Sequence, residues 1–502
     1  MKKRIFSLLL AALLLTGSFA SCSESGANTE DTDSGTETQP TTADTDAAAD
    51  STADLTSAEA RQQLPDNLPD KSFNDRNFLV GTTEAKTYEI ISEEQTGEGT
   101  NDAVYDRNLK LEDRFDVKID TVAVTSPSDD VKTNVLSGTY AYDIIGLYNF
   151  QTYIPVSEPG TLRNWCDLSY VDLTQPWHNA LANDGATING KLFAINSDLS
   201  ISTLLYSYGM FFNYAIMENY GYTSADLYNL VFEGSWTVDK MYEITSQIWE
   251  DTNGDGLHDA EDIHGYAIAN SYVNTHDVWL AALDIPVMSK NANGEYEPTF
   301  FSEKTVSALE LINNLYHASE GTLFDQSGDW RNIPKYFSNG KVAMTQLYFG
   351  ETMESLGDME ATYGILPLPK FNEEQEHYYT NCWDQFTVFG IPGTMASDED
   401  SEFIGIIYEA LSAESYKYVY PAYYDQALKS RYSAEPTTAE IIDLIMAGRK
   451  LDFTFQFGEK LQALPYTFRS MVLENETDVA SKYQKNKKAL NKTIEKVIAL
   501  YD

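Results

Sequence analysis

Alternating strand-like and helix-like patterns between residues 78 and 147 constrain the fold of this chain more than any other feature. Three short runs indicate strands, at 78–81, 117–122 and 143–147, and two segments between them have helical periodicity, at 101–115 and 129–136. This β-α-β-α-β order predicts an α/β fold with a mainly parallel sheet flanked by helices. Ligands of such sheets bind at the carboxyl ends of the strands, so Tyr148, just after the third run, is a candidate ligand contact.

The sequence also predicts which residues cap two of the helices. Asn101 is expected to cap the first helix, because its side chain can accept hydrogen bonds from the free N–H groups of the first turn. Thr237 is expected to cap a later helix that reaches Glu250. Trp236 and Trp249, which lie on or beside that helix, are expected to be structural rather than ligand contacts.

The charge balance excludes several classes of partner. The 502 residues include 34 Lys and Arg against 77 Asp and Glu, a net charge of −43. Nucleic acids and anionic lipid surfaces need clustered basic side chains, so neither is expected as the main partner. The aromatic content of 13% excludes a wholly disordered chain. The 3 Cys are too few for a disulfide framework, and the sequence leaves open whether Cys166 and Cys382 pair.

The N-terminus has the features of an export signal. Basic residues at 2–4 precede an apolar run over 5–15, shorter than the ~20 residues of a membrane-spanning helix. The Phe-Ala-Ser-Cys sequence ending at Cys22 resembles a bacterial lipobox and predicts a signal peptide over 1–21 with a lipid on Cys22. The alternative is an ordinary cleaved signal with an unmodified Cys. Residues 22–72 are then expected to form a flexible, acidic, Ser- and Thr-rich tether.

A twelve-residue acidic loop at 251–262 matches the pattern of a calcium-binding loop, with Gly256 at its sharp turn. The predicted ligands are Asp251, Asn253, Asp255, the carbonyl of Leu257, Asp259 and Asp262. Asp262 replaces the usual final Glu, and its shorter side chain predicts weaker binding. A structural Ca²⁺ is the only cofactor expected, and the alternative is a surface turn without an ion.

Five segments occur in the order found in one family of extracellular proteins. They are NGKLFAI, LYSYGMFFNYAIMENYG, GSWTVDKMYEI, FSNGKVAM and YGILPLPK. With the lipobox and the tether, they resemble the family 1, carbohydrate-type solute-binding proteins of ABC importers, over roughly residues 73–502. The resemblance implies a type II periplasmic-binding-protein fold, in which two α/β lobes, each a mainly parallel sheet flanked by helices, are joined by crossing segments.

The resemblance also implies a division of the chain. Lobe 1 is expected to comprise residues 73–198 and 371–430, and lobe 2 residues 199–370, which include the calcium-type loop. Residues 431–502 are expected to form a C-terminal helical part that belongs mainly to lobe 2. Crossing segments are expected near 197–202, near 369–386 and after a helix that begins near Ser401.

Proteins of this family bind a solute and deliver it unchanged, so no catalysis is expected. The implied ligand is a neutral sugar or oligosaccharide, captured on the extracellular face of the cytoplasmic membrane and passed to an ABC permease. The sparse Lys and Arg also argue against an anionic ligand. Contact with the membrane is expected through the lipid anchor only.

The candidate ligand contacts combine aromatic faces with polar groups. They are Tyr148, Asp198, Tyr348, Phe349, Trp383 and Asp384. In the family an aromatic residue, often Trp, follows the GKxAM strand and stacks on the sugar. Tyr348 and Phe349 stand there in this chain.

Two other classes of protein remain open. A surface glycoside hydrolase would use two carboxylates about 5–10 Å apart and would release reducing ends. A helical-repeat, glycan-binding surface lipoprotein would show helix pairs at a period of about 34 residues, and almost no strand.

Overall fold

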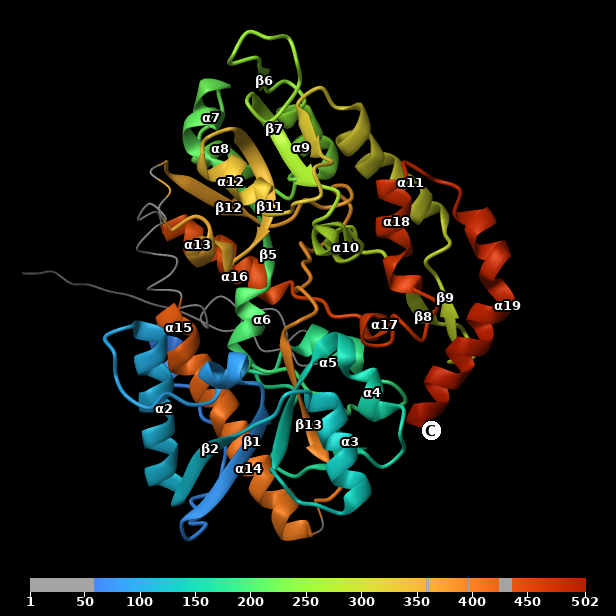
Figure 1. Ribbon diagram of the computed structural model, residues 1–502. Helices are drawn as coiled ribbons and strands as arrows, with labels where there is room; N and C mark the ends of the chain where they lie inside the picture. The colour runs from blue at the N-terminus through green and yellow to red at the C-terminus, as the bar shows by residue number, and fades with distance from the viewer. Residues whose placement is uncertain (1–57, 358, 360, 396, 424–435) are drawn as a thin grey trace, which may run out of the picture. The chain divides into compact units, whose positions relative to one another are not determined.

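Two separate β-sheets organise the protein (Figure 1). The computed structural model describes residues 58–357, 359, 361–395, 397–423 and 436–502, which belong to a compact unit that begins at Thr52. The predicted signal peptide, Cys22 and the tether as far as residue 57 lie outside the described residues. None of the helices in the described ranges is both long and apolar enough to cross a membrane.

The first sheet has the strand order β2-β1-β3-β13-β4. Its strands are β1 (Arg76–Thr82), β2 (Val117–Ala123), β3 (Ile144–Tyr148), β4 (Leu162–Arg163) and β13 (Thr387–Pro392). β1 is parallel to both β2 and β3, which confirms the predicted parallel pairing of these three strands, whereas β13 is antiparallel to both β3 and β4, so the sheet as a whole is mixed. The helices α2 (Gly99–Phe115), α3 (Pro127–Ser137) and α14 (Asp398–Glu414) pack around it. We call this sheet with its helices lobe 1.

The second sheet has the order β10-β7-β11-β5-β12. Its strands are β5 (Tyr208–Asn213), β6 (Trp249–Glu250, paired with β7), β7 (Ile263–Ala269), β10 (Thr322–Asp325), β11 (Val342–Tyr348) and β12 (Tyr363–Leu366). β5 is buried at every position because it lies between β11 and β12. The helices packed on it are α7 (Tyr214–Asn219), α8 (Ser224–Phe232), α9 (Val238–Thr245), α12 (Asn332–Ser338) and α16 (Pro436–Ala447). We call this sheet with its helices lobe 2.

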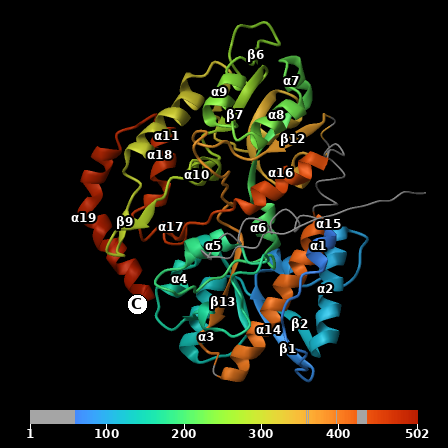
Figure 2. The ribbon, with the colours of Figure 1, turned by 180° about the vertical axis from the view of Figure 1, so that it is seen from behind.

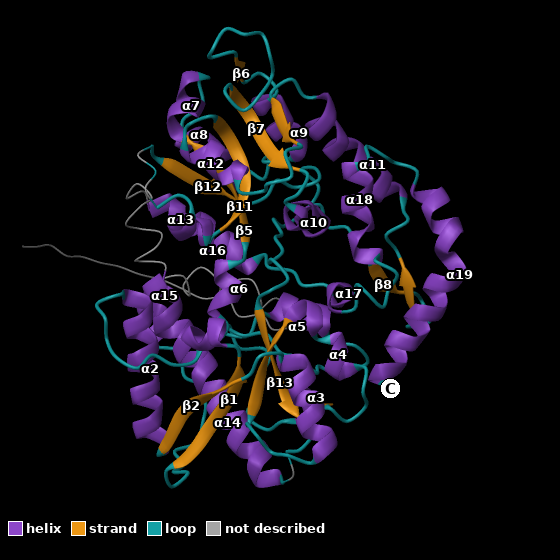
Figure 3. Ribbon diagram, viewed as in Figure 1, coloured by secondary structure: helices purple, strands orange, loops and turns teal. Residues whose placement is uncertain are grey.

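The remaining elements are short except for three helices (Figure 3). The longer ones are α10 (Val273–Ala282), α11 (Glu303–Asn313) and α19 (Val479–Ile498). The short helices are α1 (Ala58–Gln62), α4 (Tyr153–Val156), α5 (Ala180–Ala186), α6 (Ile201–Leu205), α13 (Glu351–Glu354), α15 (Tyr420–Tyr423), α17 (Phe453–Gln456) and α18 (Thr467–Leu473). β8 (Met288–Lys290) and β9 (Tyr296–Pro298) form a separate hairpin. A 3-10 helix over Glu84–Glu89 follows β1.

Three local expectations differ from the structure. α2 is capped by Glu98, whose carboxylate accepts from the N–H of Asn101, so Asn101 lies inside the first turn. Thr237 does cap α9, but the helix ends at Thr245 because Trp249 turns to pair with His264 in β7. Residues 58–72, expected to be tether, carry α1 and are held against the fold by their basic and acidic side chains, as in the 2.9 Å Arg61–Asp443 ion pair.

The chain passes between the two sheets three times. It passes between β4 and β5, between β12 and β13, and again between α14 and α16. The first two passages run side by side, since Ser207 pairs with Cys382. The predicted crossings near 197–202 and 369–386 lie within these passages, while the lobe boundaries of the sequence analysis stay predictions. Cys382 is buried and Cys166 exposed, and both are free thiols.

The C-terminal helix α19 and the residues after it connect distant parts of the chain (Figure 2). Near its start, Tyr483 stacks on Phe301, which lies between β9 and α11, with ring centroids 4.5 Å apart. Beyond its end, Tyr501 packs against Phe193, at 5.0 Å, in a segment that leads to a pairing with β13 of lobe 1. The carbonyl of Asp502 also accepts a hydrogen bond from Lys191. Residues 479–502 therefore join the segment before α11 to the segment around Phe193, in addition to the three passages.

Candidate functional site

The candidate site lies where the strands of both sheets end. The turn after β1 carries Lys86, β3 ends at Tyr148, β7 is followed by Tyr272, and β11 ends at Tyr348. Ligands of open α/β sheets bind at such carboxyl ends, because the loops there are free to vary and backbone groups remain unpaired. The second passage between the lobes contributes Trp383 to the same place.

Three aromatic side chains meet there, and we call Tyr206, Tyr348 and Trp383 the aromatic cluster. Ring centroids lie 5.0 Å apart for Tyr206 and Trp383, 5.6 Å for Tyr348 and Trp383, and 5.8 Å for Tyr206 and Tyr348. The N–H of Trp383 donates to the carbonyl of Tyr206 at 2.9 Å, which holds the two passages in register. Tyr348 is buried, and its hydroxyl donates to Glu354 at 2.9 Å. Trp383 is only partly buried, so it offers aromatic surface to a ligand.

Lobe 1 faces this cluster with an ammonium group. Nζ of Lys86 lies 4.4 Å from the ring centroid of Tyr206 and has no hydrogen-bond partner among the described residues. Burial lowers the pKa of Lys86, while the nearby Glu89 raises it. The hydroxyl of Tyr148 lies 3.3 Å from that of Thr83. Lys86 is therefore a desolvated donor that a ligand oxygen could satisfy.

Carboxylates and amides line a small cavity beside the cluster. Its lining residues are Asn149, Asn274, Asp277, Asn381, Cys382, Asp384 and Phe455. One oxygen of Asp277 accepts from Arg469 at 2.8 Å, and the other has no partner among the described residues. Burial raises the pKa of Asp277 well above its ordinary value, and Arg469 opposes that shift. Burial also raises the pKa of Asp384 and Arg469 also lowers it. Burial has the larger effect, so the pKa rises to about 6.

Further polar atoms stand unpaired around this position. One carboxylate oxygen of Glu351 is buried without a partner among the described residues, and so are the side-chain oxygens of Asn270 and Ser271, just after β7. A buried polar atom without a partner costs free energy, typically about 1–3 kcal/mol. Aromatic surface next to several unpaired donors and acceptors is the arrangement that binds a polyhydroxylated ligand.

The structure separates the residues that the sequence analysis proposed as ligand contacts. It brings Tyr348 and Trp383 together, and it places Asp384 next to them in sequence and in the lining of the small cavity. Asp198 is buried beside Arg449, 3.6 Å away, where burial raises its pKa to about 6 and Arg449 lowers it. Phe349 is fully buried and packs against the ring of Phe211 in β5. We therefore do not place Asp198 or Phe349 in the site.

Sequence reasoning missed several residues of the site. Lys86 follows the first predicted strand, so the rule that pointed to Tyr148 could have found it as well. Asp277 and Arg469 are 192 positions apart in sequence, and no local pattern links them. Tyr206 lies within a quoted family segment but carries no signal that distinguishes it from its aromatic neighbours.

Replacement of Asp384 by Asn is expected to weaken the pH dependence of stability. The folded-state pKa of about 6 lies above the ordinary 3.8, so the folded protein binds this proton more tightly than the unfolded chain. That stabilisation is full below about pH 4 and is lost as pH rises through about 6. Urea unfolding across this range should show a decline of the unfolding free energy that is smaller by about 2 kcal/mol in Asp384→Asn.

Asp400 provides the matched control. Hydrogen bonds from Ser397 and Arg76 outweigh burial and lower its pKa, so its stabilisation is lost as pH falls, not as it rises. Asp400→Asn should leave the decline between about pH 4 and 6 in place. If the unfolding free energy of Asp384→Asn changed with pH as that of the unmodified protein does, the raised pKa of Asp384 would be contradicted.

Acidic side chains of the loop at 251–262 accept hydrogen bonds from N–H groups of the loop's own backbone. The carboxylate of Asp251 accepts from the N–H groups of Gly254 and Gly256, at 2.7 and 2.9 Å. Both glycines have positive φ, +75° and +74°, which the tight turn requires. Asp262 is fully buried and accepts from Trp249 and Thr252, each at 3.2 Å. Within the described ranges, no three His, Cys, Asp or Glu side chains gather in a way that could hold a metal, so the calcium site stays a prediction.

The two sheets, their strand orders and the three passages define the type II, two-lobe fold of solute-binding proteins. The structure is similar to the GacH receptor of Streptomyces glaucescens, solved unliganded and with acarbose, at 15% identity and a TM-score of 0.50, over 84% of this chain and 99% of that one. It is also similar to a cyclo/maltodextrin-binding protein complexed with maltotetraose, at 13% identity and a TM-score of 0.52, over 84% and 96% of the two chains. No family model matches the sequence, and no curated protein matches it. At these identities the likeness shows the fold alone.

Proposed function

We propose that this protein is the substrate-binding lipoprotein of an ABC importer, which captures a neutral sugar or oligosaccharide and delivers it unchanged to the permease. The observation that carries the proposal is the aromatic cluster beside unpaired carboxylate, amide and ammonium groups, at the strand ends of both lobes. Sugars present an apolar C–H face for a ring such as Trp383 and hydroxyls for groups such as Asp384.

The placement of these groups supports capture by lobe closure. Lys86 and Tyr148 lie after β1 and at the end of β3 in the sheet of lobe 1, whereas Tyr348 ends β11 of lobe 2 and Asp277 lies in α10, which follows β7 of lobe 2. A ligand that contacts both sets stabilises the closed arrangement over any more open one, and so shifts the equilibrium between them. The permease would then recognise the closed lobes.

The structural neighbours support the choice of ligand class. One was solved in complex with acarbose and the other with maltotetraose, and both ligands are carbohydrate-like. The two sheets of this chain argue against a helical-repeat glycan-binding protein, which would have almost no strand. A glycoside hydrolase remains the rival to be tested.

Calorimetric titration with a panel of mono- and oligosaccharides tests binding, and small-angle scattering with and without the tightest ligand tests closure. We expect 1:1 binding and a smaller radius of gyration at saturation. Prolonged incubation should leave the saccharide intact. Reducing ends released by this protein would replace the proposal with the hydrolase, and an unchanged radius of gyration would remove closure from it.

The membrane anchor is part of the same proposal. A lipid on Cys22 would hold the protein at the extracellular face of the cytoplasmic membrane, with the acidic stretch that follows as a tether. Mass spectrometry of mature protein from membranes should find diacylglycerol on Cys22, and Cys22→Ser should release the protein from the membrane fraction. An unmodified N-terminus at another residue would refute the anchor.

We also propose that the loop at 251–262 binds a structural Ca²⁺ through Asp251, Asn253, Asp255, the carbonyl of Leu257, Asp259 and Asp262. An ion that binds only the folded state stabilises it by about 2–3 kcal/mol at about one hundred times its dissociation constant. Calcium added to chelator-treated protein should therefore raise the melting temperature. Asp255→Ala should abolish the rise, whereas Asp329→Ala, in another acidic loop, should not. An unmoved melting temperature of the unmodified protein would contradict the site.

A further inference from the structure

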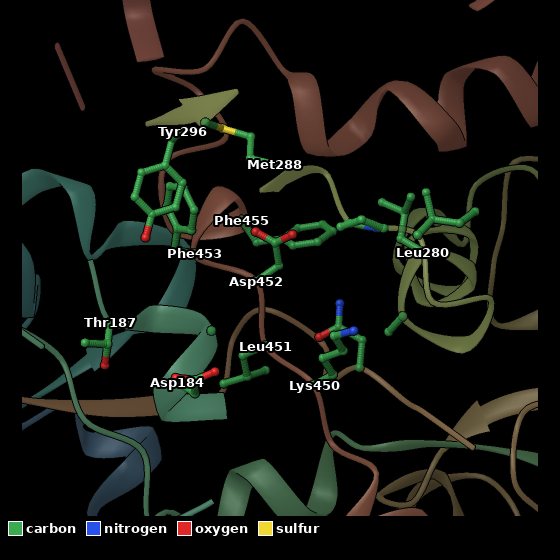
Figure 4. A pocket seen from close by; sticks show the side chains of 15 residues that line it. Asp184, Thr187, Leu280, Met288, Tyr296, Lys450, Leu451, Asp452, Phe453 and Phe455 are labelled. Carbon is green, nitrogen blue, oxygen red and sulfur yellow. The ribbon is translucent and has the colours of Figure 1, made fainter. Parts of the chain in front are cut away.

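A second, larger cavity adjoins the polar one that Asp277 and Asp384 line. Its volume is about 210 Å³. Its walls come from α5, from the end of α10, from the β8–β9 hairpin and from the segment that leads into α17 (Figure 4). For scale, an apolar cavity of about 150 Å³ is large enough to take up benzene.

The inner surface of this cavity is mostly apolar. Leu280, Met288, Tyr296, Phe453 and Phe455 supply much of it, and Figure 4 shows these side chains around the space. The rings of Tyr296 and Phe453 meet edge to face, with centroids 5.6 Å apart, which fixes both rings in one wall.

Two of the three charged residues that line the cavity are already engaged, and the third, Asp184, is exposed to solvent. Nζ of Lys450 donates to Asp284 at 2.6 Å. The carboxylate of Asp452 accepts from the N–H of Thr454 at 2.8 Å, where it caps α17. Lys450 and Asp452 therefore have partners within the protein, and most of the surface offered to an entering group is apolar.

Two residues connect the cavities. Asn381 and Phe455 line both the large apolar cavity and the small polar one. The rest of the polar cavity includes Asp277 and Asp384, and Asp384 directly follows Trp383 of the aromatic cluster in the sequence. The polar cavity has a volume of about 10 Å³, room for a single hydroxyl, so a ligand beside the aromatic cluster that places one hydroxyl there can extend a substituent past Phe455 into the apolar cavity.

We propose that the larger cavity is a subsite for an apolar substituent of the ligand, an aryl or short alkyl aglycone, so that the preferred solute is a glycoside rather than a free sugar. This inference rests on the proposed function, since the sugar part must occupy the site beside the aromatic cluster. It adds a selectivity that the aromatic cluster and the carboxylates do not provide, because those groups contact only the sugar.

Matched pairs of methyl and phenyl β-glycosides of glucose, galactose, mannose and xylose test the subsite by calorimetry. For the sugar that binds, the phenyl glycoside should bind at least tenfold more tightly than the methyl glycoside. Phe453→Ala should remove that gain and leave the affinity for the methyl glycoside within about twofold. Phe232→Ala, at a ring 51% exposed on α8, is the matched control and should keep the gain.

A second variant guards against a folding defect in Phe453→Ala. Ala281→Phe fills the cavity instead of enlarging it, and should also abolish the gain while methyl glycosides still bind. Equal affinity for the two glycosides, or a gain that survives both variants, would overturn the subsite and leave the proposed function intact. Failure of every glycoside to bind, while a free saccharide of the first panel binds, would overturn the subsite alone, and failure of the free saccharides as well would overturn both.

Discussion

Replacement of Trp383 by Ala will weaken sugar binding by about 30-fold, equivalent to about 2 kcal/mol. Trp383 is a partly exposed member of the aromatic cluster, with Tyr206 and Tyr348 packed against it at 5.0 and 5.6 Å. Its removal takes away the apolar face on which a sugar ring can lie, and it leaves the neighbouring polar groups open to water. Calorimetry with the tightest saccharide of the panel measures the change, and Trp383→Phe should recover most of the affinity.

Trp249 offers a matched control for the same substitution. It is also partly exposed, at 40%, but it pairs in β6 and packs against His258 beside the acidic loop. Trp249→Ala should leave sugar affinity unchanged within about twofold. If Trp383→Ala binds its sugar as tightly as Trp249→Ala does, Trp383 does not contact the ligand.

Replacement of Arg107 by Met will lower the free energy of unfolding by about 3 kcal/mol or more. The guanidinium is only 2% exposed and donates to the carbonyls of Glu89 and Ile90, at 3.2 and 2.6 Å, and to the hydroxyl of Ser415, at 2.9 Å. Met fills much of the space of the stem but leaves these acceptors with fewer donors in a buried place. Urea unfolding followed by circular dichroism measures the loss.

The loss of Arg107 should also affect the candidate site, because Arg107 holds Glu89. Its carboxylate accepts from the N–H of Ser202, at 2.7 Å, in the first passage between the lobes, and the same 3-10 helix carries Lys86. Arg107→Met should therefore also weaken sugar binding. Arg331→Met, at a side chain 65% exposed, should change the free energy of unfolding by no more than about 0.5 kcal/mol. Equal stability of the two variants would show that Arg107 has no structural role.

The elements of the fold could be predicted where their cause is local. The spacing of apolar residues located β1, β2 and β3 with the helices between them, because burial of one face follows from side-chain period within a few residues. The end of α9 could not be predicted in this way. Its sequence continues to favour a helix past Thr245, but pairing of Trp249 with His264 in β7 ends it, and that pairing depends on a strand which lies outside the helix.

By itself the sequence determined the α/β class, the parallel part of the first sheet and the position of Tyr148 at a strand end. Only the tertiary structure decided which polar groups meet there. Asp277 accepts a hydrogen bond from Arg469, 192 positions away in the sequence. Trp383 of the second passage packs against Tyr206 of the first, and Asp198 is buried beside Arg449. Such contacts depend on how the chain crosses between two sheets, and no short-range pattern of side chains encodes that crossing.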